Sequence, residues 1–236
     1  MSGSAVTAPA ISSSLRLRAV PGVWRPSTDA RLLADLVVQR GLARGQDVLD
    51  VFTGTGVLAL AAAQSGARSV SAIDLSRRAL LTVRLNAWRN GLRVRTLRGD
   101  LFAPVEGERF DLILANPPYF PGGDRLPVHR AARAWEGGAD GRVLVDRVCA
   151  LATGYLRPGG RLLLVHNTLT GESGTLSALR RSGLQGEVVL RHRGPLGPIG
   201  REAAARTGGT TRPEDPEEII VIMATRTREA DQAGSG

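Results

Sequence analysis

Residues 47–74 read DVLDVFTGTGVLALAAAQSGARSVSAID, and no other part of the chain says more about its architecture. The stretch begins with an apolar, strand-like run, Asp47–Phe52, and continues through a short turn that contains two glycines. An apolar run at helical spacing, Val57–Gln64, follows, and a second strand-like run covers Ser69–Ile73. A strand, a crossover helix and a second strand form the unit of a parallel sheet, so the stretch predicts an α/β protein.

The same alternation continues on both sides of this unit. Capping residues at 26–29 precede an apolar face at helical period, which predicts a helix that runs to about Arg40. Hydrophobic periodicity predicts helices over Ser76–Trp88 and Asp140–Leu156 and strands over Val94–Leu97, Phe110–Ala115, Arg161–His166, Glu187–Leu190 and Glu218–Thr225. The last two strands are expected to pair as an antiparallel edge hairpin, joined by a mobile surface loop over residues 192–215. The predicted fold is a seven-stranded, mostly parallel α/β sheet with helices on both faces.

Length and composition limit the classes of protein that this chain can represent. Its 236 residues suit one domain, expected over 21–225, with flexible tails at 1–20 and 226–236. A single cysteine, Cys149, and three histidines leave no residues for a disulfide or a structural zinc site. No apolar run reaches the roughly 18 residues of a membrane helix, so the chain is expected to be cytoplasmic and to have no membrane partner.

The charge balance of the chain is basic. Its 31 basic residues, all arginines, exceed the 22 acidic ones and give a formal net charge of +9. Such a balance indicates nucleic acid as a partner. The absence of lysine, however, points to a codon-composition bias, and the arginines are spread along the chain without a tight basic run. The charge alone therefore gives weak support to a nucleic-acid partner.

Three acidic residues stand where the first three predicted strands end. Asp50 precedes the turn that contains Gly54 and Gly56, whose lack of a side chain lets a ligand approach the backbone. Asp74 follows Gly56 by 18 residues (74 − 56), a spacing at which a carboxylate accepts hydrogen bonds from both hydroxyls of a ribose. Asp100 follows the third strand, at the sheet edge where α/β proteins bind ligands. A plain structural turn and a helix-start charge are the alternative interpretations.

The strongest chemical signal is the box Asn116-Pro117-Pro118-Tyr119, directly after the fourth predicted strand. Proline lacks a backbone N–H and fixes φ near about −65°, so the Pro117 carbonyl is expected to be a free acceptor that points out of the sheet. Together with the Asn116 amide oxygen, it can hold a planar –NH2 group and leave its nitrogen facing a third direction. Tyr119 is expected to cover the face of a planar substrate. The alternative is a turn that only ends a strand.

With this box the chain resembles the class I methyltransferases that depend on S-adenosylmethionine, and among them the release-factor glutamine N5-methyltransferases. The resemblance covers about Val23–Thr225. VWRPSTD at 23–29, followed shortly by two leucines, looks like the family's lead-in to the cofactor site, and AWEGGADGR at 134–142 looks like its glycine-rich segment. Both features point to the short archaeal and eukaryotic branch, which lacks the helical N-terminal substrate domain of the bacterial enzymes.

The resemblance implies a Rossmann-like class I fold, S-adenosylmethionine as the cofactor, and no metal. The implied cofactor-binding residues are Asp50, Thr53, Gly54 and Gly56 for the methionine part, Asp74 for the ribose, Asp100 with Leu101 for the adenine, and Leu75 and Asn116 in the same site. The implied catalytic residues are Asn116, Pro117 and Tyr119, and the implied substrate-binding residues are Asn116, Pro118 and Tyr119. Two positions depart from the family pattern: Phe52 replaces the first glycine of the turn, and Ala30 stands where threonine is common.

The expected activity is in-line transfer of a methyl group to a planar nitrogen, first of all the side-chain amide of a glutamine in a release-factor-like protein. The box does not distinguish this amide from the exocyclic amine of adenine (N6) or guanine (N2), so an RNA or DNA methyltransferase is the first alternative. A lysine methyltransferase of the same branch, a non-catalytic nucleic-acid-binding protein on the same fold and a dinucleotide oxidoreductase are further alternatives. The expected partners are the protein substrate and a small activating subunit, with nucleic acid under the alternatives.

Overall fold

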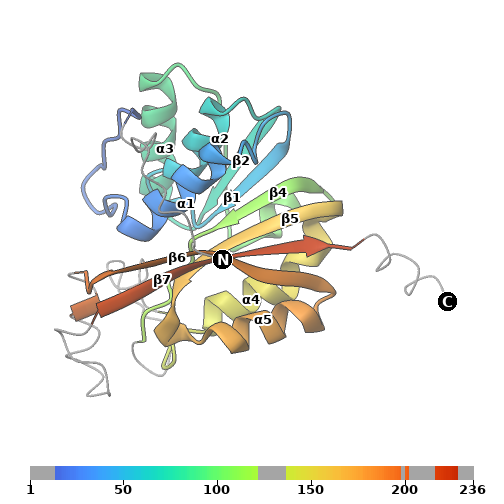
Figure 1. Cartoon of the computed structure of the whole chain (residues 1–236). Coiled ribbons are helices and arrows are strands. Elements are labelled where there is room, and N and C mark those ends of the chain that lie inside the picture. Colours follow the sequence, from blue (N-terminus) through green and yellow to red (C-terminus); the bar gives the residue numbers. More distant parts are fainter. Residues whose placement is uncertain (1–13, 122–136, 198–199, 202–215, 228–236) are drawn as a thin grey trace.

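The computed structural model describes residues 14–121, 137–197, 200–201 and 216–227. In this part of the chain the strands form one seven-stranded sheet with the spatial order β3-β2-β1-β4-β5-β7-β6 (Figure 1). The strands are β1 (Asp47–Val51), β2 (Ser69–Asp74), β3 (Arg95–Arg98), β4 (Phe110–Ala115), β5 (Leu156–Asn167), β6 (Leu184–Pro195) and β7 (Pro216–Arg226). The α-helices are α1 (Thr28–Gln39), α2 (Val57–Gln64), α3 (Arg77–Arg89), α4 (Val143–Leu151) and α5 (Glu172–Arg181), and short 3-10 helices include η2 (Ala103–Val105), η4 (Ala152–Tyr155) and η5 (Thr168–Thr170).

The sheet is mostly parallel, as the sequence predicted. Strands β1 to β5 pair in parallel with their neighbours, whereas β7 runs antiparallel to both β5 and β6. The expected edge hairpin is therefore confirmed, with β7 inside the sheet and β6 at its edge. Parallel strands end at one common edge, which brings the residues after β1, β2, β3 and β4 together.

Consecutive residues of the central strands face two separate hydrophobic cores. In β1, Val48 belongs to the core beneath α1, α2 and α3, and Leu49 belongs to the core beneath α4 and α5. Leu112 and Ile113 of β4 divide in the same way, and all four side chains are fully buried. Because helices cover both faces of the sheet, its central strands are continuous apolar runs rather than alternating ones (Figure 1).

Two element boundaries differ from the sequence prediction. Strand β6 runs from Leu184 to Pro195, so residues 192–195, expected in a mobile loop, are paired with β7. The pairing continues because β7 itself begins at Pro216 and supplies partners along the whole length of β6. Residues 198–199 and 202–215 of the expected loop lie outside the described residues, as do residues 1–13 and 228–236 of the expected tails.

The second difference concerns the expected helix Asp140–Leu156. The α-helix covers only Val143–Leu151, and η4 continues it to Tyr155. Strand β5 already begins at Leu156, so the Arg-Pro-Gly-Gly sequence at 157–160 lies inside the strand and does not form a turn between the helix and the strand. The register of β5 with β4 shifts at this point. Helix α5 was not predicted at all, because its buried face consists of only Thr175, Ala178 and Leu179. No helix in the described ranges is long and apolar enough to cross a membrane.

Candidate active site

Asp50 lies at the centre of the edge where the parallel strands end. Its Oδ2 atom accepts hydrogen bonds from the Thr53 hydroxyl (2.6 Å) and the Ala59 backbone N–H (3.1 Å). Its Oδ1 atom is buried and has no hydrogen-bond partner. Burial raises the pKa of Asp50 to about 7, although both hydrogen bonds act in the opposite direction. A buried carboxylate oxygen without a donor fits a ligand that brings its own N–H groups.

The turn after β1 has the backbone of a glycine turn, although one of its positions is not glycine. Phe52 has a φ of 60°, in the left-handed region, where Gly54 (φ 53°) and Gly56 (φ 85°) also lie. The Thr53 N–H donates to the Ile73 carbonyl (3.1 Å) and the Gly56 N–H donates to the Thr53 carbonyl (2.7 Å). Phe52 packs on the core beneath α4 and α5, which offsets the strain of its φ. The departure from the family pattern therefore preserves the turn.

Asp74 ties this turn to the end of β2. Its Oδ2 atom accepts from the Gly54 backbone N–H (3.0 Å), and its Oδ1 atom accepts from the Ser76 N–H (2.8 Å). Burial raises the pKa of Asp74, and the two backbone hydrogen bonds partly offset this rise. Leu75, expected beside the cofactor, follows with its side chain 53% exposed. Asp50 is thus bonded to Thr53 and Asp74 to the adjacent Gly54, so both carboxylates contact the same turn.

Asp100 has a partner that sequence reasoning missed. Its carboxylate receives two hydrogen bonds from Arg147 of α4, at 2.7 and 3.3 Å. Both side chains remain substantially exposed, at 46% and 41%, so this ion pair adds little stability and can exchange for another partner. The neighbouring Leu101 is buried and has a positive φ of 49°.

The Asn-Pro-Pro-Tyr box follows β4 with its first two acceptors free. Within the described part of the chain, no group donates a hydrogen bond to the Asn116 amide or to the Pro117 carbonyl. Asn116 is half-buried, whereas Pro117 and Pro118 are buried. The two prolines add no donors of their own, because neither has a backbone N–H. Both groups are therefore available as acceptors, and their use as a pair that holds a substrate stays a prediction.

Tyr119 is an anchor in this structure. Its ring is only 4% exposed, its hydroxyl donates to Asp29 Oδ2 of α1 (2.6 Å), and its carbonyl accepts from the Thr170 hydroxyl (3.1 Å). Burial, followed by the charge of Asp29, raises the pKa of Tyr119 well above its usual value. Stacking of Tyr119 on a substrate stays a prediction, but its contacts explain how the box is held rigid.

A buried polar network extends from this anchor to the end of β5. Asn167 accepts hydrogen bonds from the Thr170 backbone N–H (3.3 Å) and hydroxyl (3.1 Å), and its amide donates to Glu217 of β7 (3.1 Å). Sequence reasoning missed all three residues. A signal was present, since Asn167 directly follows an apolar strand in the same way as Asn116 does. The network joins β5 and β7 to the box through residues far apart in the chain.

The glycine-rich segment packs on the backbone of the box; of the expected segment 134–142, residues 134–136 lie outside the described residues. The Gly137 N–H donates to the Phe120 carbonyl at 2.8 Å. Gly141 has a φ of 74°, and a Cβ atom there would lie 2.1 Å from the Tyr119 carbonyl oxygen. The close approach requires glycine, because any side chain would push the box away.

Replacing Gly141 by alanine is expected to destabilise the protein by about 3 kcal/mol or more, from both the left-handed φ and the clash with backbone. The measurement is urea unfolding at constant pH. The matched control is Gly66→Ala, since Gly66 has a φ of 85° but nothing within 4 Å of the added Cβ. The control should lose only the conformational part, about 1–2 kcal/mol. Equal losses in the two variants would show that the close contact carries no energy.

Comparison with known proteins identifies the family. The profile of the methyltransferase small domain family matches residues 16–185. A provisionally named protein N5-glutamine methyltransferase of Methanocaldococcus jannaschii is 32% identical over 183 residues, which cover 77% of this chain and 91% of that protein. The release factor glutamine methyltransferase of Mycolicibacterium smegmatis is 36% identical over 188 residues, covering 75% of this chain and 66% of the relative.

Solved structures are similar in fold. The Mtq2–Trm112 complex of E. cuniculi, described as methylating the eRF1 translation termination factor, matches with a TM-score of 0.63 at 23% identity and covers 87% of this chain and 99% of that one. A T. thermophilus 16S rRNA N2 G1207 methyltransferase, solved with AdoMet and guanosine, matches with a TM-score of 0.61 at 23% identity, over 88% of this chain and 46% of that one. These likenesses, the sheet order and the matching profile confirm the predicted kinship: the chain belongs to the methyltransferase small domain family and has the class I methyltransferase fold.

Proposed function

We propose that this chain is an S-adenosylmethionine-dependent N-methyltransferase that acts on the side-chain amide of a glutamine in a release-factor-like protein. The observation that carries the proposal is the pair of free acceptors, the Asn116 amide and the Pro117 carbonyl, at the sheet edge that also holds Asp50. The names of the methanogen and mycobacterial relatives support the same acceptor class.

The residues at this edge fit the proposed cofactor. The Asp50 Oδ1 atom is buried without a donor, which suits the amine of a methionine group, and the turn at Gly54 and Gly56 keeps side chains away from the backbone. Asp74 is the carboxylate for the ribose, and Leu75, Asp100 and Leu101 border the adenine in the proposed assignment. When bound, S-adenosylmethionine supplies a methyl group on a positively charged sulfur, which is a strong electrophile.

The task of the chain's own residues is to orient a weak nucleophile. An amide nitrogen is weakly nucleophilic because its lone pair is delocalised into the carbonyl. Asn116 and Pro117 accept hydrogen bonds from the two N–H protons, and this interaction strengthens as positive charge develops on the nitrogen. No covalent nucleophile is required, and the Cys149 thiol is buried in the core with its pKa raised to about 12. Catalysis by positioning and electrostatics fits these features.

We also propose a small partner subunit, because one of the similar structures is a complex of a methyltransferase with a second protein, Trm112. The alternative substrate is an exocyclic amine of RNA or DNA, which presents the same planar –NH2 group to the box. The two substrate classes can be told apart because protease digests a methylated protein and nuclease digests a methylated RNA or DNA.

The test is transfer of a labelled methyl group from S-adenosylmethionine into a cell extract, with the Asn116→Ala variant as the blank. We expect label that protease digestion releases and nuclease digestion leaves intact, and one added methyl group on a glutamine of a release factor by mass spectrometry. Label that only nuclease releases would replace the proposed substrate by the alternative one. Cofactor binding without any label would indicate that the proposed partner subunit has to be added.

A further inference from the structure

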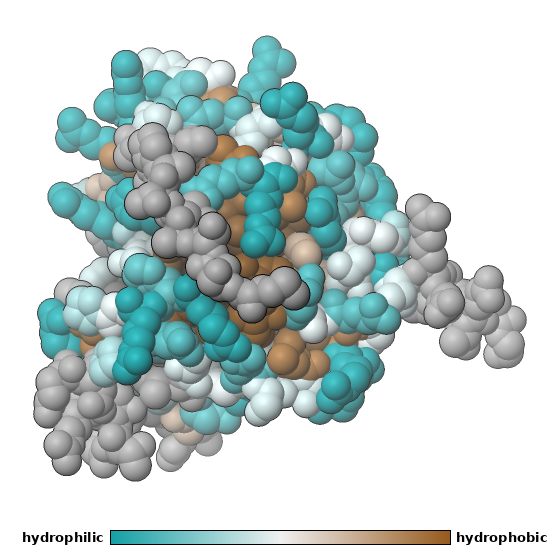
Figure 2. Space-filling model, in the orientation of Figure 1, coloured by the Kyte–Doolittle hydropathy of each residue, from teal (hydrophilic) through white to brown (hydrophobic). Residues whose placement is uncertain are grey.

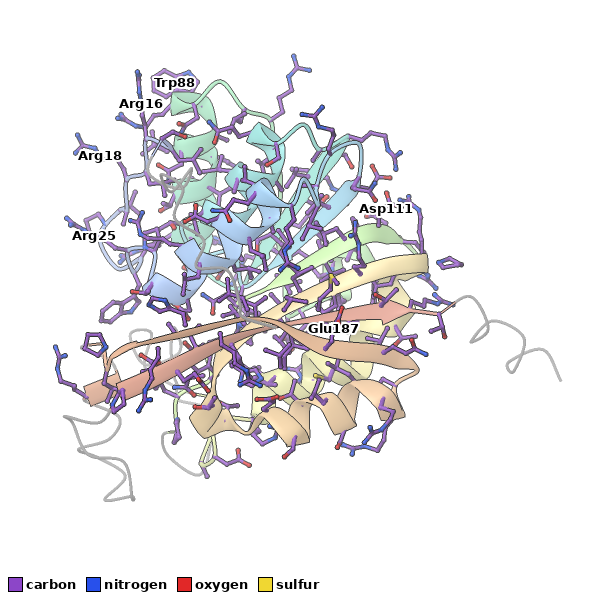
Figure 3. All side chains as sticks on the ribbon, viewed as in Figure 1. Arg16, Arg18, Arg25, Trp88, Asp111 and Glu187 are labelled. Carbon is purple, nitrogen blue, oxygen red and sulfur yellow. The ribbon has the colours of Figure 1, made fainter. Side chains whose placement is uncertain are left out.

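Four exposed arginines lie together without acidic partners. Arg18, Arg25 and Arg31 line one open cavity of about 400 Å³, and Arg16 lies two residues before Arg18 on the same extended segment. Figure 3 shows Arg16, Arg18 and Arg25 projecting from the same side of the molecule. In the space-filling view of the same orientation, hydrophilic side chains project from this margin (Figure 2). We call these four residues the arginine surface.

Helix α3 holds the extended segment in place. The Arg16 N–H donates to Asn90 Oδ1 and the Arg18 N–H donates to Asn86 Oδ1, both at 2.9 Å. Each amide donates back to the carbonyl of the same residue, at 3.3 Å for Asn90 and 2.9 Å for Asn86. The segment therefore lies along the helix with its backbone satisfied. Leu17 is half-buried between the two exposed arginines, so the arginine side chains are directed outward.

These four arginines are set apart by lying beside one cavity, because other described arginines, such as Arg180 and Arg193, also have no acidic partner. In the described residues, every ion pair of the protein involves another arginine: Arg68, Arg95, Arg142, Arg147, Arg157 or Arg191. The fold supplies carboxylates to those six arginines and none to these four, which lie beside one cavity, so their charge is available to a polyanion.

Two tryptophans are exposed on the same part of the molecule. Trp24, directly before Arg25, is 49% exposed, and Trp88 near the end of α3 is 77% exposed. Figure 3 shows Trp88 on the same side as Arg16 and Arg18. Large aromatic rings are costly to leave in water, and an indole offers a flat face on which a nucleobase can stack. An acidic peptide would pair with the arginines, but its carboxylates have no flat ring to stack on the tryptophans.

We infer that the arginine surface binds single-stranded RNA, with phosphates in the cavity lined by Arg18, Arg25 and Arg31 and a base stacked on Trp24. The RNA would dock on this surface without being methylated there. The surface consists of residues of α1, α3 and the segment before α1, and it does not include the Asn-Pro-Pro-Tyr box. The inference goes beyond the proposed methylation and does not depend on it. A binding assay without any methyl donor can therefore fail while methyl transfer succeeds, and the reverse also holds.

The test is fluorescence anisotropy of a fluorescein-labelled, pyrimidine-rich single-stranded RNA with the full chain, at several NaCl concentrations. The variant Arg18→Gln/Arg25→Gln/Arg31→Gln is expected to bind at least about tenfold more weakly and to lower the slope of log K against log[NaCl] by about 2, since each lost phosphate contact removes about 0.7. The matched control, Arg180→Gln/Arg181→Gln/Arg193→Gln, makes the same change in charge on α5 and β6 and should bind within about twofold of the wild type. Equal weakening in both variants would overturn the inference in favour of diffuse attraction.

A second variant separates RNA from an acidic protein. Trp24→Ala is expected to weaken RNA binding by about fivefold or more without a change in the salt slope, because it removes a stacked base and no charge. Polyaspartate of matched charge should compete poorly with the RNA. If Trp24→Ala has no effect and polyaspartate competes as well as the RNA, the surface recognises acidic protein and the inference is wrong. Thermal melts of each variant confirm that these exposed substitutions leave the fold intact.

Discussion

Asn116→Ala is expected to lower the rate of methyl transfer by at least about 100-fold while leaving the affinity for S-adenosylmethionine within about twofold. In the proposed site the amide oxygen is one of the two acceptors that orient the –NH2 group, and it has no other partner in the described residues. Without this hydrogen bond, the substrate nitrogen that receives the methyl group is free to rotate away from it. The effect falls on turnover because the hydrogen bond strengthens only as charge develops in the transition state.

The measurement is a single-turnover rate with labelled cofactor, together with calorimetric titration of the cofactor. Asn116→Asp keeps an oxygen acceptor and should retain more activity than the alanine variant. Asn90→Ala removes an asparagine whose hydrogen bonds go to the Arg16 backbone and the Asn86 carbonyl, and it should leave methyl transfer unchanged. If Asn116→Ala lowers cofactor affinity as much as turnover, the proposed role of Asn116 is wrong.

Asp50→Asn is expected to weaken cofactor binding by about tenfold or more at pH 8, because the buried Oδ1 atom would be replaced by an amide –NH2 group, which donates and cannot accept from an amine. The pKa of Asp50 is about 7 in the folded protein without cofactor, so only the ionised form above this pH attracts a cationic amine fully. Cofactor affinity of the wild type should therefore rise as pH increases from 6 to 8. The affinity of the variant should be flat over the same range, as titration calorimetry can test.

The same carboxyl makes folding stability depend on pH. In the unfolded chain Asp50 titrates near its ordinary value of 3.8, and in the folded protein burial raises its pKa to about 7. Between these values the folded state binds a proton that the unfolded state has lost. The contribution of Asp50 to the free energy of unfolding is therefore greatest below about pH 4 and falls by up to about 1.4 kcal/mol per pH unit toward pH 7.

Asp50→Asn removes this dependence. Urea unfolding should show that the variant gains stability over the wild type between pH 4.5 and pH 7.5, while the asparagine oxygen keeps the bonds from Thr53 and Ala59. The wild type at the lower pH serves as the internal control. A constant difference between the two proteins across this range would contradict the raised pKa.

Local patterns in the sequence were enough for the parts of the site that lie at strand ends. Asp50, Asp74 and Asn116 each follow or end a buried strand, and parallel pairing of β2, β1 and β4 carries all three to one edge. Hydrophobic period is a local property, so it identified these strands and the helices between them. The hydrophobic period did not predict helix α5, because its apolar face is short and its neighbours on α4 are distant in sequence.

Contacts across long separations were beyond the reach of sequence patterns. The hydroxyl of Tyr119 meets Asp29, 90 residues away, and Asn167 meets Glu217, 50 residues away. The pairing of Asp100 with Arg147 and the extension of β6 to Pro195 depend in the same way on partners that only folding brings near.

The sequence by itself determined the α/β alternation, the turn at Gly54 and Gly56 and the donor-free backbone of the Asn-Pro-Pro-Tyr box, because each depends on residues close together in the chain. Only the tertiary structure decided which polar atoms remain without a partner. The free Oδ1 of Asp50 and the unpaired arginines are defined by what the rest of the fold leaves beside them. Hydrogen bonds and ion pairs are contacts in space, and composition does not say which groups will meet.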